Sequence, residues 1–229
     1  MKKIVIFFVA FILFIHVTNA QRKFEINAGL ILPQNNFAAD DLKYSFLEGT
    51  GHASTGASLG IKYLTPLKVK GLSLNFNINA IFNLLNKDFR EQIKNNTLPH
   101  NIKVVNPYYL NFPIFIGLNY NLELQKNFSI YGEIDPGMNI FKITDISLEG
   151  NNYNEEVKFD PSYKFAYSFS GGFIFKEKFK VGINYYNMGN HKVRYESHGV
   201  DFGQEINDKD IFSRYLKLRV INISLGFVF

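Results

Sequence analysis

The sequence predicts an all-β protein, an eight-stranded antiparallel up-and-down transmembrane β-barrel that follows a cleaved N-terminal signal peptide. Three observations favour this fold: segments of alternating apolar and polar residues recur along the chain, their connections alternate in length, and an export signal begins the sequence. The 229 residues include no cysteine, which excludes a disulfide framework and a lipid anchor on a cysteine. A membrane-spanning chain must pair all its backbone polar groups internally, so only helices or a closed barrel can cross.

Residues 1–20 have the features of a secretory signal peptide. Two lysines precede an apolar stretch over residues 4–17, and residues 18–20 supply the small side chains of a cleavage site. The stretch is shorter than the about 20 apolar residues that a membrane helix needs. We therefore expect removal of residues 1–20 and a mature outer-membrane barrel domain over residues 21–229.

Period-2 alternation marks eight candidate strands in the mature chain. The clearest is 72–84, where Leu72, Phe76 and Ile78 belong to an apolar face and four asparagines occupy the opposite face. So many asparagines do not suit the core of a soluble protein, but they suit a narrow, wet lumen. The other candidates are 24–32, 54–64, 108–120, 128–143, 163–175, 179–188 and 215–229.

The final strand ends on an aromatic residue. Over residues 219–229, isoleucine, leucine and phenylalanine alternate with small or polar residues, which is typical of a transmembrane β-strand of about 9 to 11 residues. Phe229 resembles the terminal aromatic signal read by the barrel-assembly machinery, so that machinery is an expected partner. Outward tyrosines are expected as an aromatic girdle at Tyr63, Tyr108, Tyr120, Tyr163 and Tyr215.

The connections alternate between long and short. Outer-membrane barrels have long extracellular loops and short periplasmic turns, whereas soluble domains mostly use connections of about 4 to 6 residues. A lipocalin-like soluble barrel is therefore the weaker alternative. The long connections are 33–51, 86–106, 145–161 and 189–212, and the short ones are 65–70, 121–127 and 176–178.

Charge follows the same division, because the short turns are rich in lysine and the first and third long loops are acidic on balance. Such loops could steer ligands or bridge cations to lipopolysaccharide phosphates, but exposed charges are strongly screened, so simple solvation is favoured. Outer-membrane lipid and lipopolysaccharide are the expected surroundings. The net charge of +5 does not indicate a nucleic-acid partner, since no arginine and aromatic platform accompanies it.

Two segments resemble the central hairpin of the PorT-like outer-membrane β-barrel family. They are residues 109–120 (YLNFPIFIGLNY) and 130–137 (IYGEIDPG), and the first and last strands, with 27–29 (NAG) and 225–229 (LGFVF), fit the same family. The resemblance covers nearly all of the mature chain. It implies an eight-stranded barrel of the OmpA and OmpX kind in a Gram-negative envelope, within a family of which some members are linked to secretion. It brings no catalytic residues.

Prolines and charges fall within the predicted strands. Pro113 and Pro136 each lack a backbone donor, and we expect a β-bulge at each because a closed barrel has no free edge. The interior of eight strands is only wide enough for side chains, so inward charges are expected to pair and fill the lumen rather than conduct. The predicted lumen cluster comprises Glu25, Lys62, Glu133, Asp135 and Lys164.

An enzyme is the alternative function, because some small outer-membrane barrels modify lipid A with serine, histidine and carboxylate groups at the outer rim. Ser197 beside His198 is the nearest approach to such a pair, but catalysis needs spatial contact of about 3 Å and a third, orienting group. No cofactor or metal site is predicted, since the spacing of His191 and His198 fits no ligand pair on a strand or helix. The other residues considered are Ser54, Ser213, His52 and His100.

The sequence therefore favours a non-enzymatic structural, binding or secretion-associated barrel whose long loops contact partner proteins of the envelope. The alternative is a lipid-modifying enzyme of the lipid A acyl hydrolase or transferase type. A diffusion porin is a poorer third, because eight strands leave no open channel.

Overall fold

The computed structural model describes residues 23–39, 50–91, 103–105, 107–150, 153–201, 204–208 and 214–229. The predicted signal peptide, His100 and Ser213 lie outside these ranges. Eight long strands form one closed barrel: β1 (Lys23–Pro33), β2 (Ala53–Pro66), β3 (Leu72–Leu85), β5 (Tyr108–Gln125), β6 (Phe128–Ile143), β9 (Ser162–Phe175), β10 (Phe179–Val193) and β13 (Arg214–Val228).

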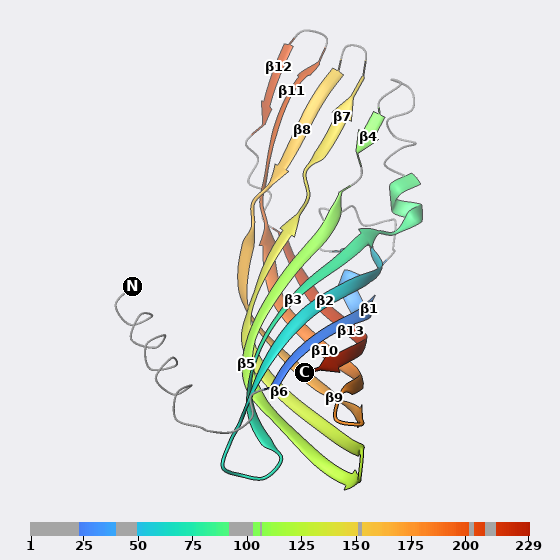
Figure 1. Ribbon diagram of the computed structural model, residues 1–229. Coiled ribbons are helices and arrows are strands. Elements are labelled where there is room, and N and C mark those ends of the chain that lie inside the picture. Colours follow the sequence, from blue (N-terminus) through green and yellow to red (C-terminus); the bar gives the residue numbers. More distant parts are fainter. Residues whose placement is uncertain are drawn as a thin grey trace, which may run out of the picture.

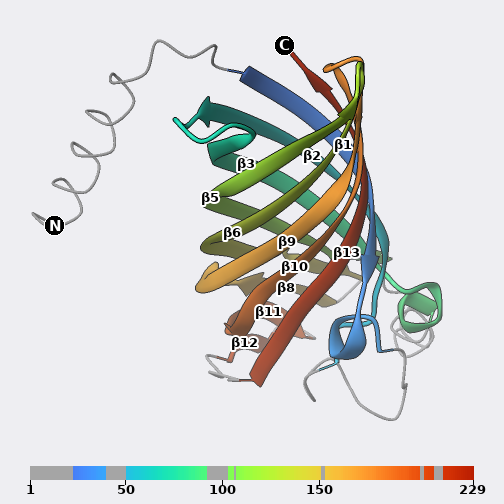
Figure 2. The same ribbon diagram turned by 90° about the horizontal axis from the view of Figure 1, so that it is seen from below.

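Each barrel strand pairs antiparallel with the next one along the barrel, in the order β1-β13-β10-β9-β6-β5-β3-β2 (Figures 1 and 2). The barrel closes between the first and last strands, where Glu25 lies opposite Val228 and Pro33 opposite Val220. Every edge is thereby paired, which removes the exposed backbone groups of an open sheet. The predicted eight-stranded antiparallel barrel is confirmed, and the ends of the predicted strands differ from the observed ones by at most five residues.

Side chains alternate across the barrel wall as the sequence predicts. Phe112, Ile223 and the half-buried Phe76 lie on the outer surface, so these apolar residues do not meet in an interior core. Tyr163 and Tyr215 are exposed near the ends of their strands, at the level expected of an aromatic girdle. The outward face is thus a band of aliphatic and aromatic side chains, as a lipid-facing surface requires.

The prediction of bulges at the two prolines was wrong. Between β5 and β6, Ile116 and Gly117 form no ladder pairs with the strand segment at Pro136. The pairing then resumes in the same register. The β3–β5 ladder likewise continues unshifted past Pro113. The ladder tolerates a missing N–H donor locally, because neighbouring pairs on both sides hold the strands together. Register shifts occur instead at 53–56, 123–125 and 187–189.

The long connections contain a second sheet that the sequence did not predict. Its order is β12-β11-β8-β7-β4, and Figure 1 shows it continuing the barrel wall beyond the barrel mouth. The hairpin β7–β8 extends β6 and β9, and the hairpin β11–β12 extends β10 and β13. We call this the outer sheet; its strands are β4 (Lys103–Val105), β7 (Ile146–Glu149), β8 (Tyr153–Phe159), β11 (Tyr195–Asp201) and β12 (Gln204–Asp208).

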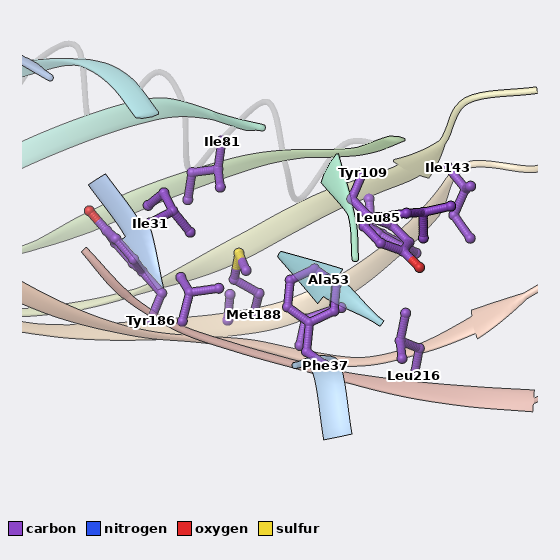
Figure 3. Close-up of a cluster of buried hydrophobic side chains, with 14 of the residues drawn as sticks. Ile31, Phe37, Ala53, Ile81, Leu85, Tyr109, Ile143, Tyr186, Met188 and Leu216 are labelled. Carbon is purple, nitrogen blue, oxygen red and sulfur yellow. The ribbon is translucent and has the colours of Figure 1, made fainter. Parts of the chain in front are cut away.

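The barrel interior differs between its two ends, which we name the turn end, with the short connections, and the loop end. Inward residues near the turn end are polar or charged, as predicted. Those near the loop end form a buried apolar cluster that includes Phe115 and Leu218. Figure 3 shows Ile31, Tyr109 and Met188 of the same cluster. The expected polar lumen therefore occupies only part of the barrel.

A short segment of the first connection closes the loop end. The 3₁₀ turn η1 (Asn35–Phe37) places Phe37 in the apolar cluster, where its ring contacts Tyr109 edge-on at a centroid distance of 5.2 Å. The Tyr109 hydroxyl donates to the carbonyl of Gly51, and the Gln34 amide donates to the carbonyl of Arg219 at 2.9 Å. These contacts fix the ends of the first connection over the barrel mouth. Among the described residues, no helix has the length and apolar character needed to cross a membrane.

Candidate functional site

A buried network of charges fills the lumen near the turn end. Lys180 Nζ donates to Glu133 Oε1 at 2.8 Å and to Glu25 Oε2 at 3.0 Å, and Lys62 Nζ donates to Glu133 Oε2 at 2.5 Å. Asn119 Nδ2 adds a third donor to Glu133 at 2.7 Å. All these side chains are buried. Removing two ammonium groups and two carboxylates from water is costly, so the pairing is what makes the arrangement tenable.

Asp135 lies beside this network and is held by neutral donors. Asn75 Nδ2 donates to its Oδ1 at 2.8 Å, and the Ser168 hydroxyl donates to its Oδ2 at 3.0 Å. The side chain is fully buried. Each carboxylate oxygen has one donor, which satisfies the group without a direct ion pair.

Four members of the predicted lumen cluster are buried together in the lumen, but the fifth, Lys164, is not among them. Lys164 has the inward parity of β9, yet it lies two residues after the strand begins at the loop end, and its side chain is exposed. The second lysine of the network is Lys180, not Lys164. Lys180 is the second residue of β10, directly after a short turn, and Glu25 is the third residue of β1, so both lie close to the turn end.

Small residues make room for the network. A Cβ at Gly117 would lie 2.1 Å from Asp135 Oδ1, and one at Gly182 would lie 1.9 Å from the Tyr131 hydroxyl. Tyr131 itself packs beneath Lys180, whose Nζ lies 3.8 Å from the ring centroid. The glycines of the lumen are therefore part of the charge site, because any larger side chain would displace a carboxylate or the aromatic ring.

A vestibule of about 370 Å³ leads from the turn end to this network. Lys180 and Glu25 form part of its wall, and exposed Lys68 and Lys70 line its mouth. Water can thus approach the lower side of the network. On the upper side, Phe115 stacks on Tyr186 at 5.8 Å and Phe141 lies 6.0 Å from Tyr109, so aromatic rings fill the lumen toward the loop end.

Polar groups in the apolar half form a small separate set. Asn139 Nδ2 donates to Asn111 Oδ1 at 2.8 Å, and His191 Nε2 donates to the Met188 carbonyl at 2.8 Å. His52 stacks on Phe89 with centroids 4.1 Å apart. His191 and His52 are both fully buried. His191 belongs to β10, whereas His52 directly precedes β2, at the end of the first long connection.

The serine and histidine residues at the outer rim do not form a catalytic arrangement in the described part of the chain. Ser197 and His198 are consecutive in β11, so their side chains point to opposite faces of the outer sheet. Ser197 Oγ donates to Glu155, whereas His198 Nε2 lies 3.7 Å from Glu196. Ser54 Oγ donates to the Leu84 carbonyl at 3.2 Å. The sequence neighbours that motivated the enzyme alternative are therefore separated by strand geometry.

One face of the outer sheet is charged. The other face is apolar next to the barrel, where Phe159 and half-buried Val157 continue the apolar cluster, and it carries Ser197 and Glu155 farther out. On the charged face, Lys158 Nζ lies 3.0 Å from Glu156, which raises the pKa of Lys158, and Lys103 lies 3.6 Å from Glu149. Among the described residues, no three histidine, aspartate or glutamate side chains gather as a metal site.

The closed eight-stranded barrel with its outward apolar band has the fold of outer-membrane barrels, and comparison with solved structures shows the same fold. The chain is similar to a major outer membrane protein from Thermus thermophilus, with a TM-score of 0.52 and 9% identity over 92% of this chain and 100% of that chain. It is also similar to Neisserial surface protein A (NspA), with a TM-score of 0.50 and 10% identity over 90% of this chain and 95% of that chain.

A further similarity is to OprG from Pseudomonas aeruginosa, with a TM-score of 0.44 and 14% identity over 90% of this chain and 95% of that chain. No protein-family model and no curated protein matches the chain. At such low identity, the similarity to the first two structures shows the barrel fold alone. The PorT-like resemblance rests on its sequence motifs and stays a hypothesis.

Proposed function

We propose that this chain is a non-enzymatic outer-membrane barrel that binds a macromolecular partner of the cell envelope through its outer sheet. The observation that carries the proposal is the organisation of the long connections into a five-stranded sheet that extends the barrel wall. An ordered sheet holds its side chains in fixed positions, so a partner that binds there does not have to order a flexible loop first. The expected location is the outer membrane of a Gram-negative bacterium, with the outer sheet outside the cell.

The filled lumen supports a binding role over a transport role. Ion-paired side chains occupy the turn end, and the apolar cluster with Phe37 and Tyr109 occupies the loop end. An open pore would need a continuous polar path, and the aromatic layer interrupts it. Association with protein secretion, which the PorT-like resemblance implies, is one form that the partner role could take.

Site-specific photocross-linking on intact cells tests the proposal. A photoreactive amino acid replaces Val200, which is exposed on the charged face of β11, or Ile183, which is exposed on the lipid-facing wall of β10. We expect a discrete adduct with an envelope protein at Val200 that is absent at Ile183, where only membrane lipid is within reach. The binding role would be contradicted if no adduct formed at Val200 or at the exposed Glu156 and Glu196 of the same face.

The enzyme alternative has its own test, because it predicts that the chain alters the covalent structure of lipid A. The mass spectrum of lipid A should be the same in cells that carry the wild-type chain and in cells that carry Ser197→Ala. A shift in acyl-chain mass that depends on this chain would favour a lipid-modifying enzyme instead.

A further inference from the structure

The outward wall of the barrel has a groove at the pair of strands β5 and β6. Leu118, Tyr120 and Leu74 lie on one side of it, and Phe169 of β9 lies on the other. Its volume is about 760 Å³. The groove lies where the β5–β6 ladder skips the pairs opposite Pro136.

Gly132 leaves one part of this groove without a side chain. It faces outward between Ile130 and Ile134, and a Cβ added there would meet no atom within 4 Å. Its cross-strand neighbour Gly171 would meet only the backbone oxygen of Tyr131, at 3.5 Å. The glycines of the lumen are required by close packing, whereas these two are not. Glycine weakens a strand interior, and it often marks a place where another molecule approaches the backbone.

The chemistry of the groove selects a hydrocarbon chain. Its wall is formed almost entirely by aliphatic and aromatic side chains, so water bound there would lack hydrogen-bond partners, and an empty space would forfeit packing contacts. From Gly132 to Pro136 the strand spans roughly 13 Å, which suits an extended acyl chain. A second copy of the barrel presents a convex wall, which does not fill a concave groove.

Lysines near the turn end supply a partner for a phosphate group. Lys126 follows β5, and the Lys176 amide donates to the Asn127 carbonyl at 2.7 Å, which brings the two short turns side by side. Lys178 lies in the same turn, and all three lysine side chains are exposed. The nearest acidic residue of this turn, Glu177, already has Lys23 at 3.9 Å. Along β6, Lys126 is roughly 20 Å from Gly132 before the strand tilt is considered.

We propose that the groove binds one phospholipid, with an acyl chain over Gly132 and its anionic head group among Lys126, Lys176 and Lys178. The proposal rests on the membrane location stated above, and it adds a defined lipid site to the partner-binding role of the outer sheet. The acyl chain of an anionic phospholipid can pack in the apolar groove while its phosphate pairs with the lysines of the turns. The outer sheet lies at the opposite end of the barrel, so the two binding roles can fail independently (Figure 1).

Lipid retention tests the site. The barrel is extracted in mild detergent and incubated with equal amounts of phosphatidylglycerol and phosphatidylcholine. Native mass spectrometry then counts the bound lipids. Wild-type protein should retain about one phospholipid, mostly phosphatidylglycerol. Gly132→Leu should lower retention at least fivefold, whereas Ala80→Leu, at an exposed outward position on β3, should leave retention unchanged. Lys126→Gln combined with Lys176→Gln should abolish the preference for phosphatidylglycerol.

A fluorescence measurement tests the same lipid site without Gly132→Leu, in case that variant does not fold. The chain contains no tryptophan, so Tyr120→Trp places a single indole at the groove, and Ile61→Trp places one on the lipid-facing wall of β2. Brominated phosphatidylglycerol in detergent should quench the indole of Tyr120→Trp at near-stoichiometric amounts and that of Ile61→Trp only weakly. The proposal would be overturned by equal quenching in the two tryptophan variants, or by a folded Gly132→Leu that retains as much lipid as the wild type. It would also be overturned if the protein retained lipopolysaccharide or a second barrel instead of a phospholipid.

Discussion

The charge network at the turn end makes the loss of one lysine a sharp test of the barrel interior. In Lys180→Met, Glu25 loses the ammonium group that lies 3.0 Å from its Oε2, whereas Glu133 keeps Lys62 and Asn119. Removal of one partner from a buried pair costs about 3 to 5 kcal/mol, because it leaves a charge without compensation. Since Glu25 lines the vestibule, water can solvate it in part, and we expect a loss of about 3 kcal/mol, at the lower end of that range.

Further replacement should restore stability. In Glu25→Gln combined with Lys180→Met, the uncompensated charge is gone, so the loss should fall to about 1 kcal/mol, the value of an ordinary hydrogen bond. Replacement of Glu25, Lys62, Glu133 and Lys180 together by apolar residues of similar volume should also be tolerated. Lys103→Met, at an exposed ion pair of the outer sheet, is the control and should not change stability measurably.

Urea titration of the purified barrel in detergent measures these differences, with the folded fraction read from gel mobility before and after heating. The reasoning would be refuted if Lys180→Met matched the wild type within error. It would also be refuted if the double variant were as unstable as the single one, since the cost would then come from lost packing of the lysine stem and not from unpaired charge.

Three further outcomes follow from the structure. Deletion of Phe229, which is exposed and lies 4.8 Å from Phe227 between ring centroids, should lower the amount of folded barrel in the outer membrane while export to the periplasm continues; normal assembly would reject its role as an assembly signal. Phe37→Ala should leave a cavity in the apolar cluster and destabilise the barrel by about 3 to 5 kcal/mol in the same urea titration, and an unchanged midpoint would show that the first connection does not close the lumen. Single-channel recordings in planar bilayers should show no steady, large conductance from the wild-type barrel, and such a conductance would replace the binding role with a pore.

The outer sheet shows where sequence periodicity stops being informative. Its strands are short, from three to seven residues, and segments such as 153–159 (YNEEVKF) mix charges with few apolar residues. Period-2 alternation needs a longer run to stand out from a polar loop. These strands are stabilised by pairing with each other and by continuity with the barrel hairpins, which are contacts distant in sequence. The sequence pattern therefore predicts loops in these segments.

The division of the lumen was also missed, although the sequence contains a signal. Near the loop end of β13, the inward Leu216, Leu218 and Val220 are apolar, whereas Asn222 and Ser224 farther along the same face are polar. The change of character along one face marks the boundary between the two halves. Parity alone assigns an inward or outward direction, and the position along the barrel axis requires the strand ends and tilt. The same limitation placed Lys164 in the charge network and left out Lys180.

The sequence by itself determined the number of barrel strands, their closed antiparallel order, the outward apolar residues and the burial of Glu25, Lys62, Glu133 and Asp135 in the lumen. These features follow from local alternation and from the requirement that every backbone polar group in a membrane be paired. Only the tertiary structure decided which charges pair, that Phe37 closes the loop end, and that Gly132 lies in a groove while Gly117 accommodates Asp135. Such contacts depend on strand stagger, because side chains from distant strands must lie at the same position along the barrel axis. No local sequence pattern encodes that position.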